Sequence, residues 1–426
     1  MTRARPSGTE RGARRGAGGG GRRAKAAVGT GAPGRPAPEG RSPAAVSEVK
    51  GGSTSVEHRP LSSGGGVAGL TSNQTARAAS GAEALGPPGA LSPALERGGA
   101  FEALARALPP GAVVFADAKV LRLHPRVAAA LVGHRVLRVR AGEALKSLGA
   151  LEALAASLAG VPRSATFVAL GGGTVGDAIT VLAHLHKRGV RLLHVPTTML
   201  AAVDSSIGGK GAVNVGGVKN ALGVFHGAAE TWLCPAFFDT LSEAQRREGR
   251  LEAWKMVVTL DEPTFRRWVR VPPSDAVLLR TARALKAAVV DADPYEARGV
   301  RVVLNFGHTF GHVLESVSGY RVRHGEAVGL GLLCALDVGV ALGVTPAAVA
   351  RQVEAALPNG PTARRRLAAL TRRASVSRVR ALLGADKKGG EGGLRMVLLQ
   401  QPGRWCVMDV PEATWAPRWA RGWRRD

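Results

Sequence analysis

The chain has 426 residues, of which 45% are hydrophobic, so it can bury a sizeable core and is too apolar to be disordered throughout. Lysine and arginine number 58 against 32 acidic residues, which gives a formal net charge of +26. The three cysteines, Cys234, Cys334 and Cys406, are odd in number and far apart, which excludes a disulfide scaffold and fits a reducing compartment.

The sequence gives no sign of a membrane or secretory segment. We find no apolar run of about 18 residues, the length that a membrane span needs. The N-terminus is arginine-rich but is not followed by the apolar core of a signal peptide. We therefore expect a cytoplasmic protein without membrane contact.

Residues 1–92 form a compositional block of their own, rich in glycine, alanine, arginine and proline. Such a segment cannot bury enough surface to offset its ordering entropy, so we expect a disordered extension. Residues 1–25 carry eight basic residues and one acid. Contact with nucleic acid or a membrane is one interpretation of this charge, and a solvated tail is the other. We expect no nucleic-acid partner, because stacking aromatic residues are absent there.

From residue 93 onward, short apolar strands alternate with helical patterns such as 145–158, which indicates βαβ units and a parallel sheet. The expected strands are 112–116, 135–140, 165–170 and 191–195. After residue 235 helical spacing takes over, at 242–260, 275–292, 309–318, 325–342 and 346–357, with one late strand at 394–399. We predict an α/β domain at 93–234, with a Rossmann-like parallel sheet, followed by a mostly α-helical domain at 235–426.

Three tryptophans, Trp415, Trp419 and Trp423, recur at intervals of four near the C-terminus. A stripe that faces a membrane is one interpretation. Packing against the helical domain is the other, and it is the one we favour. Pro417 lies within the stripe and argues against a helix there.

A glycine-rich turn follows the third predicted strand, at Gly171, Gly172, Gly173, Thr174 and Gly176. It satisfies G-x-G-x-x-G, in which glycines let the backbone approach a phosphate at a helix N-terminus. A tight strand-to-helix turn also uses glycine, so the motif alone leaves both interpretations open. Soon after it, residues 197–220 combine hydroxyl groups, an acid, a diglycine and two lysines. Two lysines are notable in a chain with eleven among its 58 basic residues.

The helical half contains His308 and His312 at positions i and i+4, on one face of a predicted helix. Metal ligands often have this spacing, and an HxxxH pattern also occurs by chance. His324 and an upstream acid such as Glu252 would complete a site of three protein ligands with an open position for a catalytic divalent metal.

The motifs GGGTVGD, VPTTMLAAVDSSIGGK, VKN, LEAWK, LNFGHTFGH, RHGEAV and ADKK follow one another in this chain. Their order and spacing resemble those of the 3-dehydroquinate synthases, within the sugar phosphate cyclase family, from about residue 97 to about residue 400. The resemblance implies that the chain is a carbon–oxygen lyase with a bound NAD, one divalent metal (zinc or cobalt), and a homodimeric assembly. Five of the eleven lysines fall within these motifs, and two more, Lys146 and Lys286, match other positions of the family.

The resemblance also assigns residues to roles. The implied metal ligands are Glu252, His308 and His324. This set replaces the pair of His308 and His312 that the spacing suggests, and His312 becomes a second active-site histidine. The implied catalytic and substrate-binding residues are Asp204, Lys210, Lys255, Lys286, Arg301, Asn305, His312, Lys388 and Arg188, the last reaching the neighbouring subunit's site. The implied NAD contacts are Asp117, Glu143, Lys146, Gly171, Gly172, Gly173, Thr174, Asp177, Thr197, Thr198, Lys219, Asn220 and Thr240.

The family's reaction converts an acidic sugar phosphate, 3-deoxy-D-arabino-heptulosonate 7-phosphate, to 3-dehydroquinate and phosphate in the shikimate pathway of aromatic amino-acid biosynthesis. Its carboxylate and phosphate call for lysine and arginine. We weigh two other enzymes: a cyclase that acts on a sugar phosphate without the carboxylate, and a metal-dependent polyol dehydrogenase, which would accumulate NADH. Lys119 stands where the family usually has asparagine near the cofactor ribose, which leaves tolerance of NADP open.

Overall fold

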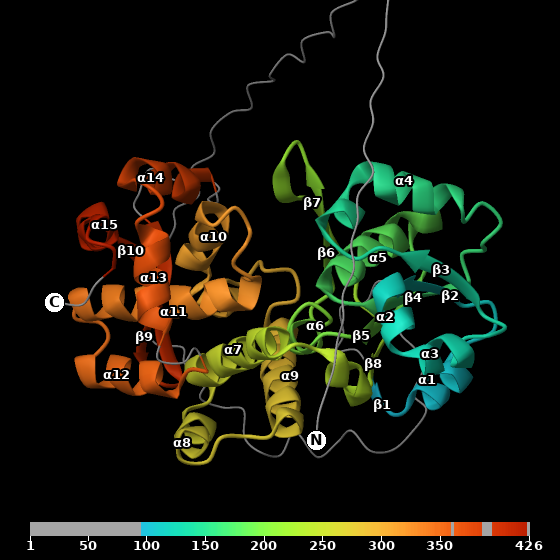
Figure 1. Cartoon of the computed structure of the whole chain (residues 1–426), viewed down its shortest axis with the longest axis horizontal. Coiled ribbons are helices and arrows are strands. Elements are labelled where there is room, and N and C mark those ends of the chain that lie inside the picture. Colours follow the sequence, from blue (N-terminus) through green and yellow to red (C-terminus); the bar gives the residue numbers. More distant parts are fainter. Residues whose placement is uncertain (1–94, 359–361, 386–393, 424–426) are drawn as a thin grey trace, which may run out of the picture. The chain divides into compact units, whose positions relative to one another are not determined.

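The computed structural model describes residues 95–358, 362–385 and 394–423 (Figure 1). The extension expected at 1–92 lies outside the described residues, as does Lys388. The predicted order of a parallel α/β part followed by a mostly helical part is confirmed within them.

A six-stranded parallel sheet organises the first part, in the order β1-β8-β5-β4-β2-β3. The four predicted strands are confirmed as β2 (Val113–Asp117), β3 (Arg135–Val139), β4 (Thr166–Gly171) and β5 (Arg191–Pro196). Two short strands escaped prediction, β1 (Leu95–Gly98) and β8 (Glu230–Leu233). Four residues are too few for an apolar pattern to stand out from its surroundings.

Successive side chains of β2 enter different hydrophobic clusters, because a strand points its side chains alternately to opposite faces. Phe115 lies in one cluster with Phe167 of β4 and Val175, while Val114 lies in the other. The second cluster continues into the helical part, where it contains Phe310 among other residues. One core therefore joins a face of the sheet to the helices that follow.

Helices connect and cover the strands of this sheet (Figure 1). They are α1 (Phe101–Ala107), α2 (Ala118–Leu123), α3 (Pro125–Ala130), α4 (Leu148–Ala156), α5 (Gly173–Leu185) and α6 (Met199–Val203). An antiparallel hairpin, β6 (Lys210–Val215) and β7 (Val218–Phe225), follows α6. It was not predicted, because its glycines and lysines hide the alternation of a strand.

The five helices predicted for the second part are confirmed as α7 (Glu243–Leu260), α9 (Asp275–Ala292), α10 (His308–Val317), α11 (His324–Ala341) and α12 (Ala347–Ala356). The structure adds α8 (Glu262–Arg270), α13 (Ala363–Thr371) and α14 (Val376–Ala385). The late strand is β9 (Leu394–Gln401), and it pairs with an unpredicted β10 (Arg404–Val410). A capping box of Ser242 and Gln245 begins α7.

One helix of the described part, α11, is long and apolar enough to cross a membrane by length and composition, with a mean hydropathy of 1.3. However, 78% of that window is buried inside the protein. Its acids are also paired, Glu326 with Arg366 and Asp337 with Arg364. These features are those of a core helix.

The tryptophan stripe packs into the protein, as favoured above. Trp415, Trp419 and Trp423 are at most 3% exposed, and all three rings contact the ring of Phe310 on α10. The expectation that Pro417 prevents a helix is wrong, because α15 (Glu412–Ala420) contains it. Burial of the tryptophans outweighs the helix hydrogen bond that proline removes.

We expect Trp423→Ala to lower the free energy of unfolding by about 3–5 kcal/mol, the usual cost of truncating a buried tryptophan. The substitution also leaves Asp337 Oδ2 without the indole N–H that lies 3.0 Å away. Urea unfolding measures the loss. Val132→Ala, at a side chain that is 81% exposed, is the control and should change stability by less than about 0.5 kcal/mol. Equal unfolding midpoints for Trp423→Ala and the wild type would contradict a stabilising contribution from the packing of Trp423 against Phe310.

Candidate active site

The glycine-rich turn lies at the carboxyl edge of the parallel sheet, between β4 and α5. The backbone N–H of Thr197, which follows β5, donates to the carbonyl of Gly171 at 3.0 Å. A Cβ added at Gly173 would lie 3.3 Å from Ser205 Oγ, and one at Gly172 would lie 3.2 Å from Thr198 Cγ2. The turn therefore packs closely against the loop after β5, with little room for side chains at these glycines, and it lies at the edge where open α/β sheets bind their ligands.

A buried lysine links three of the residues predicted to bind the cofactor. Lys146 Nζ donates to Asp177 Oδ2 at 2.6 Å and to Asn220 Oδ1 at 2.5 Å. Burial raises the pKa of Asp177, and the Lys146 charge offsets this only in part. Asp177 belongs to α5, which starts at the glycine turn, and Asn220 belongs to β7. Lys146 therefore joins the hairpin to the glycine turn.

A second set of contacts joins the β6–β7 hairpin to residues of other segments. Glu143 accepts hydrogen bonds from Asn214 Nδ2 at 2.8 Å and from Lys219 Nζ at 3.0 Å. The Lys219 ammonium also lies 4.1 Å from the ring centroid of Tyr320, which precedes α11. Predicted cofactor residues from three segments are therefore interconnected around the turn.

Two other predicted cofactor residues, Asp117 and Thr240, lie in different places. Asp117 ends β2, which neighbours β4 in the sheet, so its carboxylate lies at the same edge as Gly171, where it accepts from the Lys119 N–H. Thr240 instead shares a hydrogen bond of 2.9 Å with His124 Nε2, beyond the far end of α2. These contacts place Asp117, but not Thr240, beside the glycine turn.

Next to the turn, Asp204 faces the helical part. Lys286 Nζ, from α9, donates to Asp204 Oδ1 at 2.5 Å and to its carbonyl oxygen at 2.6 Å. Burial would raise the pKa of Asp204, but the charges of Lys286 and Lys255 hold it at about 2. Burial likewise lowers the pKa of Lys286, against the opposing charge of Asp204. The pair ties the strand-end loop to α9.

Arg301 and Lys210 provide further positive charge beside this pair. The Arg301 guanidinium donates to the carbonyl of Pro294 at 2.7 Å and to that of Gly208 at 3.3 Å. Lys210 Nζ forms an ion pair with Glu296, whose carboxylate lies 3.5 Å from Arg301 Nε. Lys286, Arg301 and Lys210 thus each contact the segment 204–210 or belong to it, and such cations are the groups that bind an anionic ligand.

Glycines let α7, α10 and α11 cross at short range. A Cβ at Gly331 of α11 would lie 1.9 Å from the carbonyl oxygen of Gly307, which caps α10. A Cβ at Gly325 would lie 2.6 Å from the Cα of Glu248 on α7. The three helices that carry the predicted metal ligands therefore meet where their backbones touch, as Figure 1 shows for α10 and α11.

Glu252 of α7 is fully buried. Its Oε1 is paired with Lys255, whose Nζ also donates to the Leu304 carbonyl at 2.5 Å. Within the described part, its Oε2 has no hydrogen-bond partner. A buried carboxylate oxygen without a partner is costly, so this atom suits a cation.

The histidine rings come together at the same crossing. The centroids of His308 and His324 are 5.3 Å apart, and that of His312 lies 5.6 Å from His308 and 6.1 Å from His324. Burial and the charge of Lys255 hold the pKa of His308 well below its usual value, so the ring is neutral and offers a lone pair. The rings of His308 and His324 thus lie side by side, and Glu252 is buried on the third of the crossing helices.

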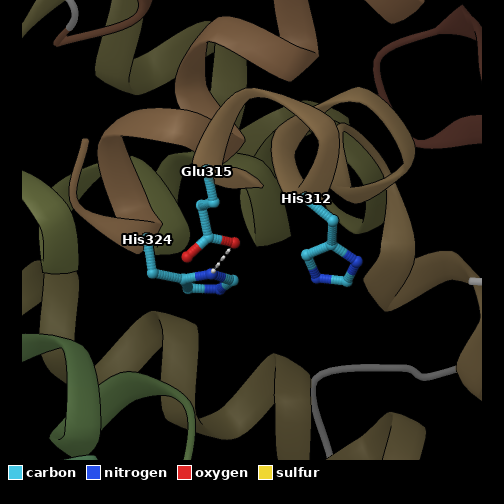
Figure 2. Close-up of side chains that lie close together, drawn as sticks. All are labelled: His312, Glu315 and His324. Atoms are coloured by element: carbon cyan, nitrogen blue, oxygen red, sulfur yellow. Dashed lines mark hydrogen bonds and ion pairs between the residues drawn. The ribbon is translucent and has the colours of Figure 1, made fainter. Parts of the chain in front are cut away.

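Sequence reasoning missed Glu315. Its Oε2 lies 3.3 Å from His324 Nδ1, and the ligand atoms of His312, Glu315 and His324 all lie within 4.8 Å of one another (Figure 2). Burial lowers the pKa of His324, but the hydrogen bond and charge of Glu315 outweigh it and raise the pKa overall. The spacing of Glu315, seven residues after His308 on one helix face, was the signal available.

The remaining predicted residues are less closely tied to this cluster. Asn305 is exposed at the end of the turn that starts at Arg301. Arg188 is exposed and adopts a φ of 67°, next to Lys187 at 47°, in a turn after α5. Such left-handed backbone is strained for side chains other than glycine and is concentrated at functional sites. That Arg188 reaches a second subunit stays a prediction.

Two family models together match more than half of the chain. Residues 136–248 match the model for 3-dehydroquinate synthase N-terminal, and residues 251–389 match the one for 3-dehydroquinate synthase C-terminal. A 3-dehydroquinate synthase of Endomicrobium trichonymphae is 34% identical over 320 residues, which cover 71% of this chain and 87% of the relative. One from Pyrobaculum neutrophilum is 39% identical over 292 residues, covering 65% and 82%.

The fold also matches a solved structure, the 2-epi-5-epi-valiolone synthase of Streptomyces hygroscopicus subsp. jinggangensis with NAD+ and Zn2+ bound. The TM-score is 0.67 at 25% identity, over 78% of this chain and 96% of that one. Sequence and fold agree, and the chain belongs to the 3-dehydroquinate synthase family.

Proposed function

We propose that the chain converts 3-deoxy-D-arabino-heptulosonate 7-phosphate to 3-dehydroquinate and phosphate in the cytoplasm, using NAD and one zinc or cobalt ion. The observation that carries the proposal is the buried Oε2 of Glu252, which has no hydrogen-bond partner in the described part, together with the neighbouring rings of His308 and His324 on two crossing helices. It supplies the acid and two imidazoles that a catalytic zinc site needs. The named relatives are dehydroquinate synthases, and the solved cyclase named above has NAD+ and Zn2+ bound.

The glycine turn is the place for NAD. Its backbone, which carries no side chains at Gly172 and Gly173, and the N-terminus of α5 suit a pyrophosphate. Asp117, at the neighbouring strand end, suits the hydroxyl groups of a ribose. Lys146 and Lys219 keep the β6–β7 hairpin beside the cofactor through Asp177 and Glu143.

When bound, NAD accepts a hydride and later returns it, and the divalent cation polarises the hydroxyl group that is oxidised. Lys255 Nζ, held between Glu252 and the Leu304 carbonyl, is placed to move a proton at that hydroxyl. His312, whose ring faces His308, is placed to receive a proton as phosphate leaves. We assign both roles as proposals.

The cations around Asp204 bind the substrate. Lys286, Arg301 and Lys210 come from different segments and converge beside the predicted metal ligands, so they can hold a carboxylate and a phosphate at two ends of one molecule. Asn305 and Lys388 are assigned to the same task. Arg188 would reach the phosphate in the neighbouring subunit of a homodimer.

A product assay tests the proposal and its nearest competitor. We expect the purified protein with NAD and Zn2+ to release phosphate from the heptulosonate phosphate and to form dehydroquinate in equal amount, without accumulating NADH. Chelation should abolish the activity, and Zn2+ or Co2+ should restore it. Turnover of glucose 6-phosphate or sedoheptulose 7-phosphate alone would contradict the substrate assignment, and accumulation of NADH would indicate a dehydrogenase.

The cofactor site is tested by a matched pair of glycine substitutions. We expect Gly173→Ala to weaken NAD binding by about tenfold or more, equal to about 1.4 kcal/mol, because its Cβ would enter the space between the turn and Ser205. Gly149→Ala, on α4 with open space around it, should leave the NAD Kd unchanged. Calorimetric titration measures both. Equal affinities for the two variants would contradict the placement of NAD at the turn.

A further inference from the structure

A carboxylate that the proposed ligand set does not use lies against one of its histidines. Figure 2 shows Glu315 over the ring of His324, with His312 opposite both. The Nδ1 of His324 is 3.3 Å from Glu315 Oε2, and the Glu315 side chain is 13% exposed. The contact joins α10 to the first residue of α11.

This contact determines which nitrogen of the His324 ring carries the hydrogen. A carboxylate accepts, so Nδ1 carries the hydrogen, and the lone pair of the neutral ring is then on Nε2. Metal-bound histidines commonly have this arrangement, in which the second nitrogen donates to a carboxylate that fixes the orientation and the tautomer of the ring. We propose that Glu315 is a positioning residue that holds His324 Nδ1 and thereby presents Nε2 to the metal. The inference rests on the proposed metal site.

The close crossing of α10 and α11 explains why Glu315 can do this. His308 and Glu315 are seven residues apart on α10 and so share a face. Gly331 brings the backbone of α11 against Gly307 just before that face begins. The same face therefore supplies one ligand, His308, and the residue that orients another.

A different arrangement uses the same side chains, with His312, Glu315 and His324 as the ligands, since their ligand atoms lie within 4.8 Å of one another. That set would leave Oε2 of the buried Glu252 without a partner. It would also leave unused His308, whose ring centroid lies 5.3 Å from that of His324. Both costs disappear when Glu252 and His308 bind the ion and Glu315 acts through His324.

The test is metal affinity, measured by competition for Zn2+ against a chromogenic chelator in the NAD-loaded protein. We expect Glu315→Ala to weaken Zn2+ binding about 10–100-fold, as is usual when such an outer carboxylate is lost. Glu315→Gln should recover part of the loss, because its amide oxygen still accepts from Nδ1. The matched control is Glu326→Gln. Glu326 lies on the same helix as His324, and its carboxylate is paired with Arg366. The Glu326→Gln protein should bind Zn2+ as the wild type does.

Two further variants distinguish a positioning residue from a ligand. We expect His308→Asn to abolish tight Zn2+ binding and His312→Asn to leave it within about threefold, less than the 10–100-fold loss expected at Glu315. Loss of binding in His312→Asn with retention in His308→Asn would overturn the proposal, because Glu315 would then be a ligand. Wild-type affinity in Glu315→Ala would overturn it as well. Absence of Zn2+ binding by the wild type would instead refute the proposed metal site itself.

Discussion

The close crossing of α7, α10 and α11 is the constraint on which the rest of the site depends. Each helix contributes one of the proposed ligands, and each ligand lies near the point where the backbones touch, at Gly331 against Gly307 and at Gly325 against Glu248. Any side chain at either glycine would push the helices apart. Separated helices would carry the ligands away from one another although each ligand residue is unchanged. The glycines therefore matter to the chemistry without taking part in it.

Buried charge is the second theme, and it joins the two parts of the fold. Glu252 and Asp204 are carboxylates that would be costly on their own, and Lys255 and Lys286 lie against them. Because Asp204 follows α6 at the sheet edge and Lys286 belongs to α9, their pairing aligns the glycine turn with the helical cluster. Both lysines are buried, and we propose that a metal and an acidic substrate complete the balance of charge around these pairs.

Much of this could be predicted from the sequence, because motifs with fixed spacing carry their geometry with them. The strands β2 to β5 and the helices α7, α9, α10 and α11 were all predicted from the sequence. Three features were missed for physical reasons. The β6–β7 hairpin lacks an alternating pattern, and α15 forms despite Pro417 because three tryptophans are buried. Glu315 of α10 contacts the first residue of α11, and its spacing along α10 gives no information about that contact.

The most direct test of the central claim is a crystal structure of the NAD-loaded protein with zinc, with the ion located by anomalous scattering at the zinc edge. We predict one peak at about 2.0–2.2 Å from Glu252 Oε2, from a nitrogen of His308 and from His324 Nε2. Glu315 would remain on His324 Nδ1. A peak bound by His312 and Glu315, with Glu252 still paired only to Lys255, would contradict the account.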